Sequence, residues 1–164
     1  MLTLFQVEQY AADYGLILRL QVNYCLNIWT FRVAVMQARE YHPSILLGSI
    51  KGWAYPTESG LQLDTLRIQG NYTYGVSNLL WAAIFAWARE STPCCSARLL
   101  AIYDEDYQHR RLIRYFKRIG FRSKRVLKSS IVDLPLLLIW GGPGLIMQVD
   151  CTTALERCEK WLEV

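Results

Sequence analysis

The chain has few of the residues that build metal centres and disulfide frameworks. It contains two histidines, His42 and His109, which are far apart in sequence, and five cysteines with no C-x-x-C pair. Neither spacing is that of a metal site. Cys151 and Cys158 lie about two helical turns, or roughly 10 Å, apart and cannot be bridged within one helix. We therefore expect no metal, and reduced thiols in a cytoplasmic compartment.

Long apolar runs are also missing. The richest, Leu134–Trp140, is too short to cross a bilayer, and Met1–Val7 lacks the basic start and cleavage site of a signal peptide. No repeat, linker or low-complexity segment divides the chain, so residues 1–164 are expected to form one domain. Six Trp, ten Tyr and a 52% hydrophobic share are typical of a packed globular protein.

Positive charge is concentrated in one stretch. Nine of the eighteen basic residues lie between Arg110 and Lys128, with no acid among them, although the net charge is only +4. Such a run can be a solvated helix face, a site that neutralises phosphate, or a docking surface for an acidic protein. No RNA- or DNA-binding motif accompanies it, so nucleic acid is not the expected partner. The docking candidates are Arg110, Arg111, Arg114, Lys117 and Arg118.

Hydrophobic periodicity predicts a mixed α/β domain. Helices are expected at 76–90, 107–119 and 152–162, and strands at 28–37, 44–55, 61–68, 97–103 and 145–149. A strand at 1–7, a helix at 8–25 interrupted at Gly15, and extended segments at 126–132 and 134–140 are also expected. The last segment should form a hairpin with 145–149. Its apolar residues are assigned to the core, with an acceptor pocket or a dimer interface as alternatives.

Two segments carry the functional signal. In Leu61–Ala88 a strand leads through a glycine-bearing turn into a helix, whose unpaired N–H groups and dipole can bind phosphate. The alternative is an ordinary strand-to-helix turn. In His109–Arg122 a second helix follows a short strand and ends in the pattern Phe116-x-x-x-Gly120-Phe121.

Together these segments resemble the GCN5-related N-acetyltransferase (GNAT) superfamily. The turn over 72–77 is similar to the family's Q/R-x-x-G-x-G/A pyrophosphate turn, and 116–121 is similar to its Tyr-x-x-x-Gly-Phe ending. The resemblance covers about residues 29–150. It implies an α/β fold with a central, mostly antiparallel sheet and helices on both faces. The chain departs from the family pattern at Tyr72 (Gln or Arg), Ser77 (Gly or Ala) and Phe116 (Tyr).

The resemblance implies an acetyl-CoA-dependent N-acetyltransferase, in which an amine of a small molecule or a protein attacks the thioester directly. A general base removes the amine proton and a general acid protonates the thiolate. The implied cofactor-binding residues are Leu66, Arg67 and Ile68 for the pantetheine, and Tyr74, Gly75, Val76, Ser77 and Asn78 for the pyrophosphate.

The catalytic candidates are fewer. Asp64 is a candidate base, with Asp104 and Glu105 as alternatives, and His109 can serve as acid or base. Tyr115 is the candidate acid beside Phe116, although neighbouring helical residues point about 100° apart. Because Phe116 has no proton to give, the alternative is a catalytically degenerate member used as an interaction or assembly module. Either a monomer or a homodimer is expected.

Overall fold

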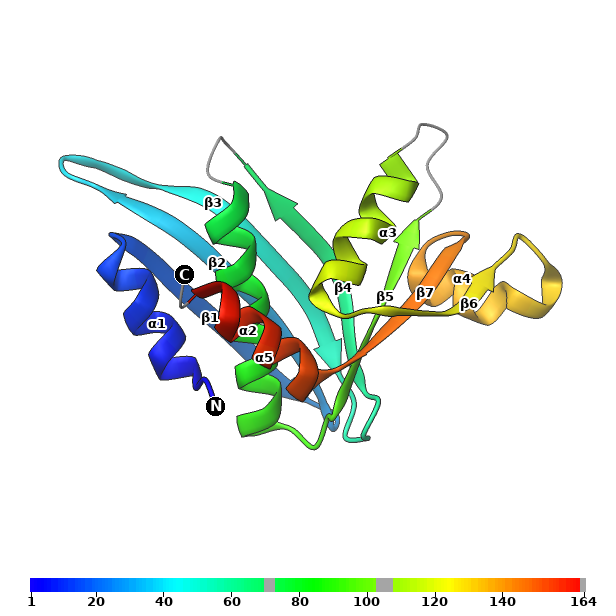
Figure 1. Ribbon diagram of the computed structural model, residues 1–164. Helices are drawn as coiled ribbons and strands as arrows, with labels where there is room; N and C mark the ends of the chain where they lie inside the picture. The colour runs from blue at the N-terminus through cyan, green and yellow to red at the C-terminus, as the bar shows by residue number, and fades with distance from the viewer. Residues whose placement is uncertain (70–72, 103–107, 163–164) are drawn as a thin grey trace.

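The computed structural model describes residues 1–69, 73–102 and 108–162. A seven-stranded sheet, in the order β1-β2-β3-β4-β5-β7-β6, forms the centre of the domain (Figure 1). Neighbouring strands are antiparallel except for β4 and β5, which are parallel. The strands are β1 (Leu16–Cys25), β2 (Ile28–Arg39), β3 (His42–Ala54), β4 (Leu61–Ile68), β5 (Ser96–Ile102), β6 (Arg122–Leu127) and β7 (Gly144–Asp150).

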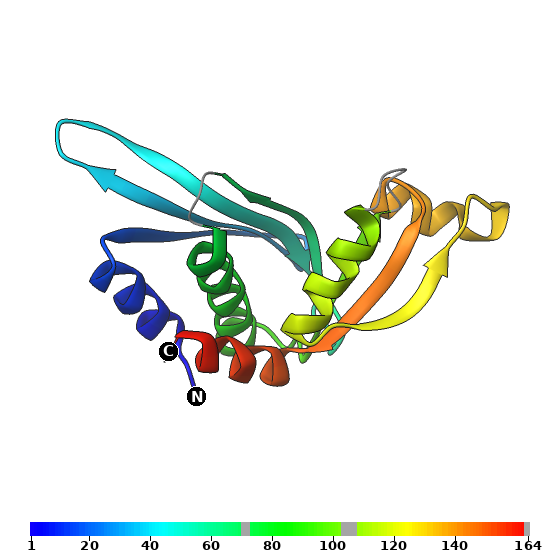
Figure 2. The same ribbon diagram turned by 45° about the horizontal axis from the view of Figure 1, so that its top comes forward.

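Helices lie on both faces of this sheet, as expected. One face is covered by α1, α2, α3 and α5, and the short helix α4 lies over the other, which we call the open face (Figures 1 and 2). The helices are α1 (Leu4–Asp13), α2 (Thr73–Ser91), α3 (Gln108–Ile119), α4 (Leu134–Trp140) and α5 (Cys151–Leu162), and the 3₁₀ turn η1 (Ile131–Asp133) precedes α4.

Helix α2 forms the centre of the core. Every residue from Leu79 to Ala88 is buried, because α2 packs against the sheet on one side and against α1 and α5 on the other. A helix that is apolar all round is typical of this position. At Gly48 of β3 a Cβ atom would lie 2.8 Å from Val76 Cγ1, so glycine is what lets the first turn of α2 approach the sheet.

The Gly120-Phe121 pair ends α3 and fixes it to α2. The N–H of Gly120 (φ +116°) donates to Lys117 O at 3.1 Å, and the N–H of Phe121 donates to Phe116 O at 3.0 Å, which is the Schellman pattern. Phe121 is thereby buried against Trp81, with ring centroids 5.7 Å apart. The glycine predicted to end this helix is confirmed.

The N-terminal strand expected at residues 1–7 is wrong. Helix α1 begins at Leu4, because Thr3 Oγ1 accepts from the N–H of Gln6 and Gln6 Oε1 accepts from the N–H of Thr3, which is a capping box. The helix expected to run to residue 25 ends at Asp13. After Gly15, which has φ +70°, residues 16–25 pair with β2 along their whole length as β1.

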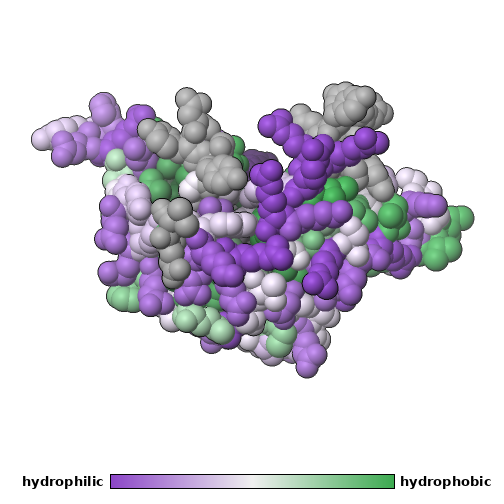
Figure 3. Space-filling view, in the orientation of Figure 1, coloured by the Kyte–Doolittle hydropathy of each residue, from purple (hydrophilic) through white to green (hydrophobic). Residues whose placement is uncertain are grey.

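The extended segment and hairpin expected around residues 134–149 are also wrong. Residues 134–140 are helical, with Pro135 in the first turn and Gly141 (φ +78°) donating its N–H to Leu137 O at the C-cap. The antiparallel partners of β7 are β5 and β6. Nor is the segment core, since no α4 side chain is buried and Leu138 is 77% exposed. Hydrophobic side chains accordingly appear on the surface at this end of the molecule (Figure 3).

Candidate functional site

The parallel pair β4 and β5 is joined over a short length only. The strands pair from Leu61 opposite Ala97 to Leu63 opposite Leu99. Beyond that point β4 stays paired with β3, and β5 stays paired with β7. Figure 1 shows the two strands diverging toward the end of the sheet where α2 and α3 begin. We call this opening the β4–β5 fork, and its two facing edges carry backbone groups with no strand partner among the described residues.

A small cavity lies at the fork. Trp81 of α2 and Phe116 of α3 form its wall on the helical side, and residues of the diverging strands form the rest. The cavity is therefore reached by groups from both halves of the domain. Its lining residues are Ile50, Leu63, Asp64, Thr65, Leu66, Trp81, Leu99, Leu100 and Phe116.

The first turn of α2 faces the same end of the sheet. Gly75 is exposed, and a Cβ atom there would meet no heavy atom within 4 Å. Val76 and Ser77 are buried, and Asn78 is half-buried. The unpaired N–H groups of a first helical turn and its positive dipole make such a position suited to anions. Tyr72 lies outside the described residues, as do the side chains of residues 73 and 74.

The basic residues of α3 lie on its solvent face. Arg110, Arg111, Arg114, Lys117 and Arg118 are all exposed, and none forms an ion pair with another residue that the structure describes. Figure 3 shows hydrophilic side chains over this helix. Helix α3 begins at the same end of the sheet as α2 (Figure 2), so two helix N-termini lie in the region of the fork.

Asp64 lies at an irregularity in β4, where the strands begin to part. Lys51 is opposite Thr65 and Gly52 is opposite Leu63, so Asp64 is an extra residue in a β-bulge. Its Oδ2 lies 3.5 Å from Lys51 Nζ and accepts from the Thr65 hydroxyl at 3.1 Å. Arg67 is opposite Ser49, and this register places Arg67 on the open face with Lys51, away from α2.

The Tyr115 hydroxyl is bonded across the helices. Trp81 Nε1 donates to Tyr115 Oη at 2.7 Å, and Trp81 is itself almost fully buried at the fork cavity. The hydroxyl of Tyr115 is therefore bonded to a residue that lines the cavity, and Tyr115 itself is not among the lining residues. Sequence reasoning did not find this bond, which joins residues 34 positions apart.

The side chains of the remaining catalytic candidates lie outside what the structure describes. Asp104 and Glu105 lie outside the described residues altogether. His109 is in the first turn of α3, and its side chain is likewise outside what the structure describes. Within the described part of the chain no group of three or more His, Cys, Asp or Glu residues has the arrangement of a metal site.

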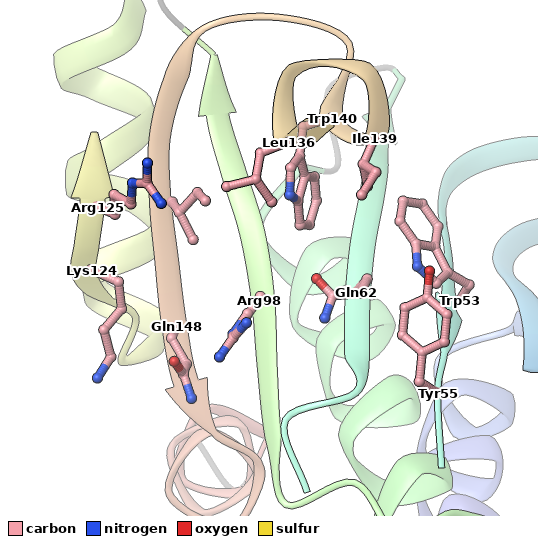
Figure 4. Close-up of a pocket in the computed structure, with 11 residues that line it drawn as sticks. Trp53, Tyr55, Gln62, Arg98, Lys124, Arg125, Leu136, Ile139, Trp140 and Gln148 are labelled. Atoms are coloured by element: carbon pink, nitrogen blue, oxygen red, sulfur yellow. The ribbon is translucent and has the colours of Figure 1, made fainter. Parts of the chain in front are cut away.

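A larger cavity lies on the open face, under α4 (Figure 4). A pocket lined by residues 134–140 was an alternative in the sequence analysis, but the strand residues of its floor were not found from the sequence. It encloses about 420 Å³, and we call it the α4 pocket. The floor of the pocket is a row of side chains that the strand register places next to one another. Trp53 is opposite Gln62, Gln62 is opposite Arg98 and Arg98 is opposite Gln148. This row crosses β3, β4, β5 and β7. The lining residues are Trp53, Tyr55, Gln62, Arg98, Lys124, Arg125, Leu136, Ile139, Trp140, Ile146 and Gln148.

The cysteines are free thiols. Cys94, Cys151 and Cys158 are buried, and Cys25 and Cys95 are exposed. Burial raises the pKa of both Cys151 and Cys158 to about 12 and also raises the pKa of Cys94. These three groups are packing residues rather than ionised nucleophiles.

Similarity to known proteins lies in the fold and not in the sequence. No protein-family model matches the chain, and no curated protein matches it. Nourseothricin acetyltransferase superposes with a TM-score of 0.53 at 14% identity, over 84% of this chain and 88% of that one. A protein from Desulfovibrio desulfuricans, described as a GNAT-family acetyltransferase, superposes with a TM-score of 0.53 at 14% identity, over 74% of this chain and 69% of that one.

A chimera built on the spermidine N-acetyltransferase of Vibrio cholerae gives a TM-score of 0.52 at 11% identity, over 77% of this chain and 71% of that one. At these identities the likeness is one of fold. The chain has the GNAT fold in a divergent form, as the resemblance in sequence implied.

Proposed function

We propose that this chain, which has the GNAT fold, is an acetyl-CoA-dependent N-acetyltransferase that transfers an acetyl group to an amine. The observation that carries the proposal is the β4–β5 fork. Beyond Leu63 and Leu99 two strand edges face each other without pairing, and an extended ligand with amide groups can pair with them as a strand would. The pantetheine arm of acetyl-CoA has this character, and the backbone of Leu66, Arg67 and Ile68 is our proposed partner.

The charge at the end of the fork fits the rest of the cofactor. The segment from Tyr74 to Asn78 is the expected pyrophosphate site, and the backbone N–H groups of Tyr74, Gly75 and Val76 in the first turn of α2 are proposed to hold it, with open space in front of Gly75 to admit it. The N–H groups of Ser77 and Asn78 lie in the second turn, where they have acceptors within the helix. Arg110 and Arg111 are exposed in the first turn of α3, whose N-terminus lies at the same end of the sheet (Figure 2), and would add a positive field. This use of the basic helix is the one we propose, in place of docking of an acidic protein.

The chemistry is proposed as a direct transfer. The amine nitrogen attacks the thioester carbonyl, the C–S bond breaks, the amine proton passes to a base and the thiolate receives a proton from an acid. Asp64, in the bulge where β4 leaves β5, is the proposed base. Tyr115 is the proposed acid, because its hydroxyl accepts a hydrogen bond from Trp81, which lines the fork cavity. His109 is kept as an alternative for either role.

The setting of the protein is proposed from its thiols. All five cysteines are unbridged, and free thiols of this number are typical of a reducing compartment such as the cytoplasm. No helix in the described ranges is long and apolar enough to cross a membrane.

Thermal unfolding with acetyl-CoA tests the proposal. Ligand at about 100 times its dissociation constant should add about 2.7 kcal/mol, which corresponds to a rise in Tm of about 5–11 °C for a chain of this size. Gly75→Glu should abolish the rise by placing a carboxylate at the phosphate site. It should leave the free protein folded, since the added side chain meets open space. Gly142→Glu, also in open space, is the matched control and should retain the full rise.

Two results would count against the proposal. If millimolar acetyl-CoA leaves the Tm of the unmodified chain unchanged, the protein does not bind the cofactor. If Gly75→Glu binds acetyl-CoA as well as the control does, the pyrophosphate site is misplaced. If acetyl-CoA binds but is not transferred to any amine, the alternative of a catalytically degenerate interaction module is favoured. The specific argument for that alternative is Phe116, which is buried at the cavity and has no proton to donate.

A further inference from the structure

The α4 pocket combines uncompensated positive charge with apolar walls. We propose that it binds the acceptor of the transfer, and that this acceptor is an amine that also carries a carboxylate, in the form of a free amino acid with an apolar side chain. The identification of the pocket as the acceptor site rests on the proposed function. The binding of a carboxylate with an apolar group can be tested independently of it.

The charge of the pocket is the first argument. Arg98, Lys124 and Arg125 line it, and no aspartate or glutamate is among its described lining residues. Arg125 is paired with Asp133, but neither Arg98 nor Lys124 forms an ion pair with another residue that the structure describes. Arg98 is half-buried, whereas Lys124 and Arg125 are exposed. A half-buried cation without an ion pair favours an anionic ligand and disfavours a polyamine.

The surroundings of Arg98 indicate which anion. The register sets Arg98 between Gln62 and Gln148, on the floor of the pocket (Figure 4). Both glutamines already donate elsewhere, Gln62 to Ser59 O at 3.2 Å and Gln148 to Ser96 Oγ at 2.8 Å, so their amides are held in place. The planar guanidinium of Arg98, in a half-buried site, matches the two oxygens of a carboxylate.

The walls indicate an apolar group. Leu136, Ile139 and Trp140 of α4 face the floor, and the Trp140 ring lies 5.8 Å from the Trp53 ring. The buried Trp53 Nε1 has no hydrogen-bond partner among the described residues. Buried N–H groups are rarely left unpaired, so this donor is available to a ligand oxygen. At about 420 Å³ the pocket is within the range of small-molecule sites.

The position of the pocket relates the carboxylate to the amine. Gln62 and Arg98 face each other one residue before Leu63 and Leu99, the last pair before the strands part. One residue along a strand spans about 3.3 Å. When the carboxylate of an α-amino acid is bound near Arg98, its amine, which is attached to the adjacent carbon, therefore lies close to the fork. A long diamine fits this short spacing less well.

The test compares an acid with its amide, which differ only in the carboxylate, and adds spermidine as a polyamine for comparison. N-acetyl-L-phenylalanine, N-acetyl-L-phenylalaninamide and spermidine are titrated into the full chain without acetyl-CoA, following heat or indole fluorescence. We expect the acid to bind about 10- to 100-fold more tightly than the amide, as is usual for a hydrogen-bonded charge, and spermidine not to bind. Arg98→Met should remove the preference for the acid, and Arg39→Met, an exposed arginine at the end of β2, should retain it.

Each outcome decides the inference. Equal affinity for acid and amide in the unmodified chain, or tighter binding of spermidine, overturns the anionic site without any variant having to fold. Loss of the preference in Arg98→Met but not in Arg39→Met supports it.

A second experiment separates the inference from the proposed function. Release of free CoA thiol is followed with L-phenylalanine or L-phenylalaninamide as acceptor. Transfer to the acid but not to the amide supports both. Equal transfer to the two amines overturns the assignment of the pocket as acceptor site and leaves the enzyme intact. Binding of the acid with no transfer to either amine overturns the proposed function and leaves the anionic pocket.

Discussion

The hydrogen bond between Trp81 and Tyr115 should stabilise the packing of α3 on α2, and Tyr115→Phe removes it while keeping the ring. Trp81 is 1% exposed and its Nε1 donates to the hydroxyl at 2.7 Å, so the variant leaves a buried donor without this acceptor. Such a loss costs about 1–3 kcal/mol. For a chain of this length that is a fall in Tm of about 2–12 °C.

A double-mutant cycle with Trp81→Phe isolates this bond. Because Trp81→Phe removes the donor, Tyr115→Phe should cost at least about 1 kcal/mol less in that background than in the unmodified chain. Urea unfolding of the four proteins measures the coupling. Tyr41→Phe is the control, since Tyr41 is 98% exposed and the change should stay within about 0.5 kcal/mol. A Tyr115→Phe protein as stable as the unmodified chain would refute the bond as a support of the fold.

The same variants test the proposed acid. Loss of a general acid lowers kcat by about 10²- to 10⁴-fold. Tyr115→Phe should show such a loss at saturating acetyl-CoA, whereas Trp81→Phe keeps the hydroxyl and should show a smaller one. If both variants lose activity equally, Tyr115 acts by positioning α3 and is not the acid.

Three further predictions concern the loop before α4, the thiols and the basic helix. Asp133 is buried and accepts hydrogen bonds from Arg125 and from the N–H of Lys128. Asp133→Ala should therefore lower the free energy of unfolding in urea by about 1–3 kcal/mol and weaken anion binding in the α4 pocket. If both quantities are unchanged, Asp133 does not hold this loop in place. Burial raises the pKa of Cys151 and Cys158 to about 12 in the folded chain, from 9 in the unfolded chain, so the thiols of the unfolded state ionise first. The free energy of unfolding should therefore fall between pH 9 and 12, by about 1.4 kcal/mol per pH unit for each thiol. Urea midpoints at pH 9 and 10 under reducing conditions should fall less steeply in Cys158→Ala, and equal slopes would be evidence against the shift. At physiological salt Arg110→Gln should weaken acetyl-CoA binding several-fold and Arg118→Gln should not, because the two positions are about 12 Å apart along α3, beyond the Debye length of about 8 Å. Equal effects in titrations would leave the basic face without a role at the phosphates.

Much of the fold could be predicted where the signals were local. The apolar run of α2 and the glycine that ends α3 both depend on residues within a turn or two of each other, and both are confirmed. The predictions at α1 and α4 were wrong although local signals for both helices were present, because hydrophobic periodicity was given more weight. Thr3 with Gln6 formed a capping box, and Pro135 marked the first turn of a helix too short to show a period.

The candidate site could be predicted less well, because its geometry is not local. The fork exists because β4 and β5 pair over a few residues only, and nothing in either strand alone indicates where pairing stops. The floor of the α4 pocket joins side chains from four strands, and it depends on the register of each pair and on β7, rather than β6, lying next to β5. Sequence could nominate Asp64 and Tyr115, but the bulge around one and the indole bonded to the other are products of register and helix packing.

Backbone amide hydrogen exchange with and without acetyl-CoA tests the central claim most directly, because the claim concerns backbone groups at the β4–β5 fork. Acetyl-CoA should slow exchange at residues 64–68 of β4 and at residues 75 and 76 in the first turn of α2, with little change in β1 and β2. Bound acetyl-CoA that leaves the amides of residues 64–68 exchanging at their free rate would contradict the account.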